Sequence, residues 1–134
     1  PIEPEFHQTI NKFYQQNPQK QSQVQCIGNI NDKKQLWEWY NRAKVFVLTS
    51  NWESYGIVLT EAKRFSNYII STPVGAATDI IEEERYGSII NQNDITNLSI
   101  LLQDIINGDK NINEYSNKNK NEMYYSEIIK WISL

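Results

Sequence analysis

Two short apolar runs limit what this chain can fold into more strictly than any other feature. They are Val45–Leu48 (VFVL) and Tyr68–Ser71 (YIIS), and polar residues bound both of them. Continuous apolar runs of this length are typical of strands buried inside a parallel sheet. Parallel strands need a crossover connection, and the stretch between the two runs is long enough for a helix. The spacing therefore predicts a βαβ unit.

Helix and strand signals alternate along the rest of the chain. Further strands are expected over 22–27 and 88–91, and helices over 4–17, 33–43, 56–65, 78–85 and 94–107. Asp32 and Asp94 are expected to cap two of the helices, and Gly108 to end the last one. The tail over 111–134 is expected to be helical and to pack back on the domain. This alternation predicts an α/β fold, a Rossmann-like doubly wound parallel sheet with helices on both faces.

Composition excludes several classes of function. The chain has 134 residues, about one domain's worth, and its net charge of −3 is opposite in sign to that of proteins that neutralise nucleic-acid phosphates. A single cysteine, Cys26, excludes an internal disulfide and is expected to be a small core residue. His7 is the single histidine, which disfavours a soft-metal cluster and a Ser-His-Asp triad. No apolar run is long enough to span a membrane.

The segment 45–62 (VFVLTSNWESYGIVLTEA) carries most of the information about function. It predicts a strand, a loop and a helix that begins near Gly56, and ligands of such folds bind at the carboxyl ends of the strands. The first amides of a helix lack intrahelical acceptors, and with the helix dipole they can bind an anion such as a phosphate. Glu53 precedes this helix start, and Glu61 lies inside the helix. Two further loops, 28–30 and 72–78, are expected at the same edge of the sheet.

Two carboxylates beside an anion site need an explanation, because like charges repel. A nucleotide sugar provides one, since it carries ribose hydroxyls on one side of its diphosphate and sugar hydroxyls on the other. Taken alone, two Glu residues eight positions apart are usually solvent-exposed charges, and only their strand–loop–helix setting favours a functional role. Trp52 could stack on a sugar, but a tryptophan in a loop more often covers the core. Trp37, Trp39 and Tyr40 are expected to pack along one helix stripe.

Several common nucleotide-binding motifs are absent from the sequence. There is no Asp-any-Asp motif of the kind that holds a metal-bound diphosphate. There is also no phosphate loop ending in Gly-Lys-Ser/Thr and no Gly-any-Gly-any-any-Gly, which disfavours a nucleoside triphosphatase and a nicotinamide dehydrogenase.

The two glutamates form a pattern with a known counterpart. Seven residues separate Glu53 from Glu61 within ESYGIVLTEA, which follows the strand VFVL and Ser50. It closely resembles the second half of the C-terminal nucleotide-sugar domain of family 4 glycosyltransferases, retaining enzymes of the GT-B fold. The resemblance covers roughly 2–108 and includes VQCIGNINDKKQLWEWYNRAK, YIISTPVGAATDII and YGSIINQNDITNLSILLQDIING.

This resemblance implies a role for each matching residue. Glu61 would hold the ribose hydroxyls, and Glu53, the one candidate catalytic residue, would position the donor sugar through its hydroxyls. The amides of the helix start would face the diphosphate, and the main chain after the strand 22–27 would meet the base. The expected donor-binding residues are Gly28, Asn29, Ile30, Glu53, Tyr55, Gly56, Ile57, Val58 and Glu61. No metal and no cofactor besides the donor are expected.

The chain departs from the family pattern in two stretches and, with a minor effect expected, at Asp79, which stands where Glu is usual. Ser66, Asn67 and Tyr68 stand where the family has a small residue, Gly and Pro, and Gly75, Ala76 and Ala77 form its Gly-rich loop, so the extra Cβ atoms are expected to narrow the sugar site. The family's basic residues at the diphosphate and its N-terminal acceptor domain have no counterpart within 1–134. The chain is therefore expected to be a partial C-terminal donor-binding domain that does not transfer sugar alone.

The resemblance implies retaining transfer of a hexose from a nucleotide sugar to a saccharide or lipid-linked acceptor, as in polysaccharide biosynthesis. The expected location is the cytoplasm, with peripheral binding at the inner face of the membrane as an option. Two alternatives stay open. One is a non-catalytic module of the same fold that binds a nucleotide or a protein partner. The other is a sugar-nucleotide epimerase, which would need further acid and base groups that the sequence does not offer.

Overall fold

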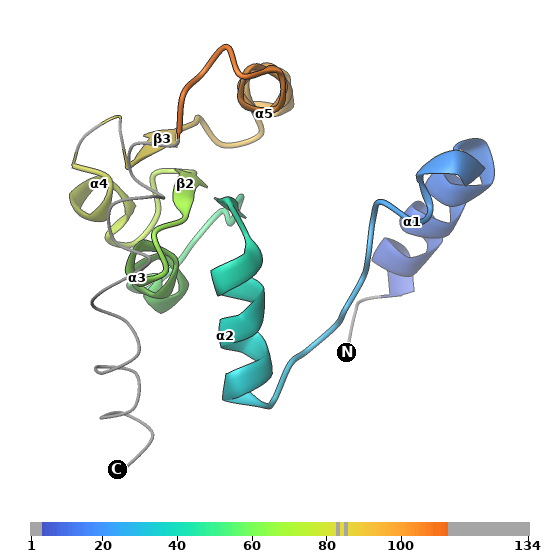
Figure 1. The fold of residues 1–134 in the computed structure, drawn as a ribbon, viewed down its shortest axis with the longest axis horizontal. Coiled ribbons are helices and arrows are strands. Elements are labelled where there is room, and N and C mark those ends of the chain that lie inside the picture. The colour runs from blue at the N-terminus through green and yellow to red at the C-terminus, as the bar shows by residue number, and fades with distance from the viewer. Residues whose placement is uncertain (1–3, 83, 85, 113–134) are drawn as a thin grey trace. The chain divides into compact units, whose positions relative to one another are not determined.

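The computed structural model describes residues 4–82, 84 and 86–112, and the chain divides into two compact units (Figure 1). The first unit ends at Trp37 and the second begins at Glu38, so the division falls inside helix α2 (Lys33–Arg42). Each unit is described by itself below.

The first unit contains helix α1 (Pro4–Gln16) and a short 3-10 helix, η1 (Pro18–Lys20). The helix predicted over 4–17 is confirmed, and Pro18 ends it because proline cannot continue the hydrogen-bonding pattern of a helix. The hydroxyl of Tyr14 donates to the carbonyl oxygen of Val24 at 2.9 Å, which ties α1 to the irregular segment that follows. Asp32 begins α2 as predicted, since its carboxylate accepts a hydrogen bond from the amide of Lys34 at 2.8 Å.

The strand predicted over 22–27 is wrong, because this segment has no strand structure. A strand is stable only when it pairs with another, and the described part of the first unit contains no second strand. Alternation of apolar and polar residues is a local signal that does not report whether such a partner exists. The core position predicted for Cys26 is also wrong, because this side chain is exposed.

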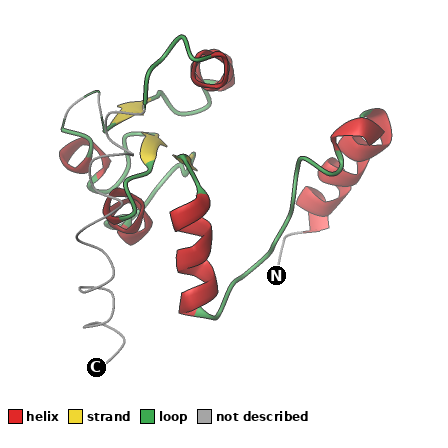
Figure 2. Ribbon diagram, in the orientation of Figure 1, coloured by secondary structure: helices red, strands yellow, loops and turns green. Residues whose placement is uncertain are grey.

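The second unit is built on a parallel sheet of three strands in the order β1-β2-β3 (Figure 2). The strands are β1 (Val45–Leu48), β2 (Tyr68–Ser71) and β3 (Gly87–Ile89). Val45 pairs with Tyr68 and Ile69 pairs with Gly87, so both ladders are parallel. All four residues of the central strand β2 are buried. The predicted βαβ unit is confirmed, although Val47 on the edge strand β1 is 39% exposed and that strand is not fully buried.

Three helices of the second unit accompany the sheet: α3 (Ile57–Arg64), α4 (Ala77–Ile80) and α5 (Ile95–Asn107). Tyr68 and Ile70 project from one face of β2 into a core formed with Leu98, Leu101, Leu102 and Ile105 of α5. Helix α3 packs against β2 and α4, and its Leu59 and Ala62 are fully buried. Figure 1 shows α5 on one side of the strands and α3 with α4 on the other. The predicted Rossmann-like α/β class is therefore confirmed.

The helix ends in this unit follow mostly from local chemistry. The Asp94 side chain accepts a hydrogen bond from the amide of Asn97, and Gly108 ends α5 in a left-handed conformation, both as predicted. Helix α4 is shorter than the predicted 78–85, because Ile80 and Ile81 are both buried and the chain leaves the helical conformation at Ile81. The carbonyl oxygen of Ile80 is satisfied by the Lys63 ammonium at 3.0 Å instead of by a further helical turn. Strand β3 begins and ends earlier than the predicted 88–91.

The helix expected over 111–134 lies almost entirely outside the described residues. Within the part of the chain that is described, no helix has the length and apolarity needed to cross a membrane.

Two glycines of this unit allow a direct test of the fold. A Cβ at Gly87 would fall on the carbonyl oxygen of Ile69 in the neighbouring strand, whereas a Cβ at Gly108 would meet nothing within 4 Å. We expect Gly87→Ala to lower the free energy of unfolding by about 3 kcal/mol, because a backbone atom of the central strand cannot move aside. Gly108→Ala should cost about 1 kcal/mol, since only its left-handed φ is unfavourable. Urea unfolding followed by tryptophan fluorescence measures both, and equal effects would contradict this account of the sheet.

Candidate functional site

The loops that follow the three strands are joined by hydrogen bonds at the carboxyl end of the sheet. Thr72 lies directly after β2. Its amide donates to the carbonyl oxygen of Leu48 at 3.0 Å, and its hydroxyl donates to the carbonyl oxygen of Ser50 at 2.6 Å. The side-chain amide of Gln92, after β3, donates to the carbonyl oxygen of Asn51 at 2.8 Å. The loop after β1 is therefore held by groups from both of the other strand ends.

Gly75 brings the loop after β2 against the main chain that precedes α3. The amide of Ala76 donates to the carbonyl oxygen of Tyr55 at 2.9 Å. A Cβ at Gly75 would lie 2.5 Å from that same oxygen, and its φ of +53° favours glycine. The close approach therefore requires glycine here. The loop 72–78 was expected to contribute to function, and the structure places its first residues directly beside the segment that begins α3.

The amino terminus of α3 presents backbone amides without acceptors. Gly56 caps the helix in a left-handed conformation, with φ 81°, and contributes no side-chain cap. The amide of Leu59 donates to the carbonyl oxygen of Gly56 at 2.9 Å, but across 4–82, 84 and 86–112 the amides of Ile57 and Val58 have no acceptor. Such amides, reinforced by the helix dipole, attract an anion. The start of this helix near Gly56 is as predicted.

Each of the two carboxylates predicted for the site accepts a hydrogen bond from a protein hydroxyl. Glu53 lies in the loop after β1, where the Ser50 hydroxyl donates to its Oε1 atom at 2.9 Å. Glu61 lies in the second turn of α3, where the Tyr40 hydroxyl donates to its Oε2 atom at 3.0 Å. Both side chains are half-buried, so neither is packed beneath the fold. Both therefore retain oxygen atoms that a ligand hydroxyl can reach.

Tyr40 is the site residue that sequence reasoning missed. It was expected to pack on a helix stripe, and it does pack, being 7% exposed with its ring 5.6 Å from the rings of Phe46 and Phe65. Its hydrogen bond to Glu61 spans 21 positions, and no local pattern signals such a pair. Burial raises the pKa of the Tyr40 hydroxyl well above its ordinary value, and the charge of Glu61 and the hydrogen bond to it raise that pKa further.

The other predicted site residues are placed as follows. Tyr55 and Ile57 are exposed on either side of the buried Gly56. Trp52 is 76% exposed, so the expectation that it covers the core is wrong, because the short loop points this ring into solvent. Gly28, Asn29 and Ile30 belong to the irregular segment of the first unit, where Gly28 has a φ of 71°. Their expected contact with a base stays a prediction.

The two departures from the family pattern lie at opposite ends of β2. Ser66 and Asn67 precede the strand, at its amino end, whereas Ala76 follows it in the loop beside Tyr55. Of these three residues, only Ala76 therefore lies at the carboxyl end of the sheet, where the sugar site is expected. Asn67 is fully buried and donates through Nδ2 to the carbonyl oxygens of Tyr40 and Ala43, which gives it a structural reason to be there.

The fold and the site together define a class of protein. Parallel strands whose carboxyl-end loops surround a helix start, with free amides and carboxylates beside it, are typical of α/β domains that bind nucleotides and other phosphorylated ligands. Within the described chain, no group of three or more His, Cys, Asp and Glu residues is arranged to hold a metal ion.

Comparison with known proteins identifies the family. The family model for glycosyl transferases group 1 matches residues 5–122. The chain therefore belongs to the group 1 glycosyltransferases, which act on a sugar donor and an acceptor, and the predicted glycosyltransferase domain of the GT-B type is supported. No curated protein matches the chain.

The Tyr40–Glu61 contact predicts a change in alkaline stability. The folded protein holds the Tyr40 proton more tightly than the unfolded chain, whose tyrosines titrate near an ordinary pKa of about 10. The stabilisation is therefore complete below about pH 10 and is lost as the pH rises above it. We expect Tyr40→Phe to lose less unfolding free energy than the wild type between about pH 9.5 and 11. Urea unfolding at several pH values measures this, and parallel pH profiles would contradict it.

Proposed function

We propose that this chain binds a nucleotide-sugar donor and takes part in retaining transfer of its glycosyl group to a saccharide or lipid-linked acceptor. Family membership supports glycosyl transfer as the reaction. The observation that carries the choice of donor is the start of α3, where the free amides of Ile57 and Val58 lie between two carboxylates in the sequence. The order is a carboxylate acceptor, two amide donors and a second carboxylate acceptor. A diphosphate flanked by two hydroxyl-rich groups matches it.

The diphosphate is the part of the donor that the helix start would bind. When the glycosidic bond breaks, the departing diphosphate gains negative charge. Amides that are already oriented toward it stabilise this charge without reorganisation, and the helix dipole acts in the same direction. In this proposal the amides of Gly56, Ile57 and Val58 provide that stabilisation, and no metal ion is invoked.

The two carboxylates would bind the hydroxyls on either side of the diphosphate. A carboxylate only accepts hydrogen bonds, so it suits a ribose or sugar hydroxyl and repels a phosphate. We assign the ribose to Glu61, which shares a helix with the diphosphate-binding amides, and the donor sugar to Glu53 in the preceding loop. Their contribution to rate is orientation of the donor, and Glu53 would bind the sugar that is transferred.

The remaining parts of the proposal concern the substrates. The donor in this proposal is a hexose nucleotide. The acceptor belongs to polysaccharide biosynthesis, and a lipid-linked acceptor would bring the protein to the cytoplasmic face of a membrane.

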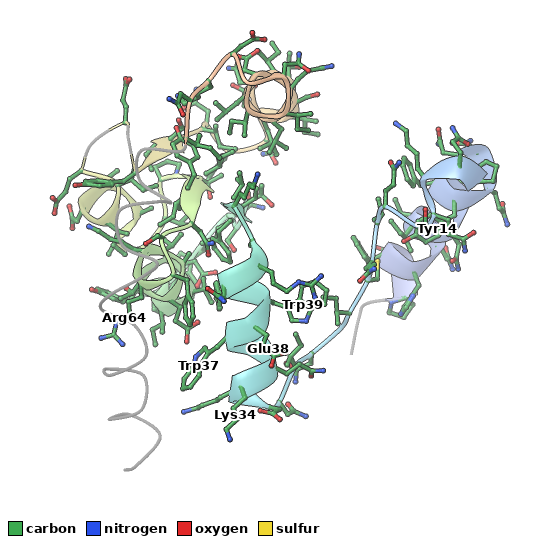
Figure 3. All side chains as sticks on the ribbon, viewed as in Figure 1. Tyr14, Lys34, Trp37, Glu38, Trp39 and Arg64 are labelled. Carbon is green, nitrogen blue, oxygen red and sulfur yellow. The ribbon has the colours of Figure 1, made fainter. Side chains whose placement is uncertain are left out.

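Calorimetric titration of the full chain with a panel of nucleoside diphosphates and their hexose derivatives tests the proposal. Glu61→Gln should weaken binding of both ligand types by about tenfold, because a charge-assisted hydrogen bond to ribose becomes a weaker one. Glu53→Gln should weaken only the binding of the nucleotide sugar, since the nucleoside diphosphate lacks the sugar that Glu53 would bind. Glu38→Gln is the matched control, because Glu38 is exposed on α2 (Figure 3) and should change neither affinity.

The outcomes separate the candidate functions. Failure of every nucleoside diphosphate to bind would overturn the proposal. Binding of the donor without turnover, in the presence of a panel of saccharide and lipid-linked acceptors, would favour a non-catalytic module. Loss of both affinities in Glu38→Gln would show that the carboxylate effects are not specific.

A further inference from the structure

We propose that Tyr40 is a positioning residue that orients the Glu61 carboxylate toward the ribose of the donor and so sets the preference for ribonucleotides. This inference rests on the proposed function and deepens it. The observation behind it is the hydrogen bond of 3.0 Å from the Tyr40 hydroxyl to Oε2 of Glu61. The other carboxylate oxygen, Oε1, has no hydrogen-bond partner among the residues that the structure describes.

The Tyr40 ring packs against two aromatic side chains. It stacks on the ring of Phe65 with an interplanar angle of 14° and packs against Phe46 of β1 at the same centroid separation of 5.6 Å. Phe65 is the residue that ends α3, one turn after Glu61. Because these two neighbours come from a strand and a helix end, the phenol hydroxyl has a fixed position relative to α3.

The main chain of Tyr40 is anchored as well. Asn67 is fully buried, and its Nδ2 atom donates to the carbonyl oxygen of Tyr40 at 2.9 Å and to that of Ala43 at 2.6 Å. These bonds tie the end of α2 to the residue that precedes β2. Tyr40 is therefore fixed through its ring and through its backbone before any ligand arrives.

A fixed hydroxyl beside Glu61 has a consequence for binding. A glutamate side chain with free rotamers loses conformational entropy when it grips a ligand, and this loss weakens the complex. The bond from Tyr40 removes much of that freedom in advance and leaves Oε1 to accept from a ligand hydroxyl. Glu61 also shares α3 with the free amides of Ile57 and Val58, so its distance from a bound diphosphate is set by a rigid helix.

A purely structural role makes a different prediction. A buried tyrosine hydroxyl needs a partner, and Glu61 supplies one, so removal of the hydroxyl would then change stability alone. The positioning role predicts in addition a change in discrimination between ligands that carry ribose hydroxyls and ligands that lack them. A ratio of two affinities in one variant reports this without depending on overall stability.

The experiment compares binding of nucleoside diphosphates with binding of their 2′-deoxy and 3′-deoxy forms by the full chain. The wild type should prefer the ribose form by at least about tenfold, because an analogue without the hydroxyl leaves a carboxylate oxygen unpaired. Tyr40→Phe keeps the ring and should reduce this ratio to about threefold or less, with affinity for the deoxy forms nearly unchanged. Adding Tyr40→Phe to Glu61→Gln should give no further reduction, because the two residues act as one unit.

Tyr68→Phe is the matched control. Tyr68 is a buried tyrosine of the same unit whose hydroxyl forms a 2.7 Å hydrogen bond with the Ser88 hydroxyl, away from Glu61. The Tyr68→Phe variant should lose about as much stability as Tyr40→Phe and should keep the wild-type ratio of ribose to deoxyribose affinities. An unchanged ratio in Tyr40→Phe, with a wild type that discriminates, would overturn the role of Tyr40 and leave the proposed function standing. A wild type that binds no nucleoside diphosphate would instead overturn the proposed function and this inference together.

Discussion

The second unit depends on the complete burial of one short strand. All four residues of β2 are buried, and the strand pairs in parallel with β1 on one side and β3 on the other. A buried strand must have every backbone donor and acceptor satisfied, so its two neighbours are fixed in register. Parallel pairing then brings three strand ends, and the loops that follow them, to one edge of the sheet.

That edge explains how main-chain groups can form the proposed site for a diphosphate. Thr72, Ala76 and Gln92 hold the loop after β1 by hydrogen bonds to its main chain. The loop leads into Gly56, whose left-handed conformation begins α3 and leaves its first amides unpaired. In the proposed site, backbone dipoles supply the positive potential, and Glu53 and Glu61 accept hydrogen bonds from ligand hydroxyls. Glu53 and Glu61 each accept one hydrogen bond from a protein hydroxyl, that of Ser50 and that of Tyr40 respectively.

Much of this arrangement could be predicted from the sequence, because its signals are local. The apolar runs at 45–48 and 68–71, the caps at Asp32 and Asp94 and the glycine at 108 all act within a few residues of themselves. The helix start beside Glu53 was predicted for the same reason. These features fix the order of strands and helices and the position of α3.

What could not be predicted depends on distant partners. The segment 22–27 alternates like a strand but has no second strand to pair with in the described part of its unit, and Cys26 is exposed. The contact of Gly75 with Tyr55 joins two loops, and the bond from Tyr40 to Glu61 joins two helices. To predict either contact, one must know which loops and helix faces meet in the fold. Periodicity and capping patterns do not contain that information.

The central claim is that the amides beginning α3 bind a diphosphate, and amide NMR shifts of the ¹⁵N-labelled full chain test it most directly. On addition of a nucleoside diphosphate, the Ile57 and Val58 amides should show the largest shifts. The Asn97 amide, which lies in the first turn of α5 but is already bonded to the Asp94 carboxylate at 3.1 Å, should show little change. Equal shifts at the two helix starts, or shifts confined to other segments, would contradict the account.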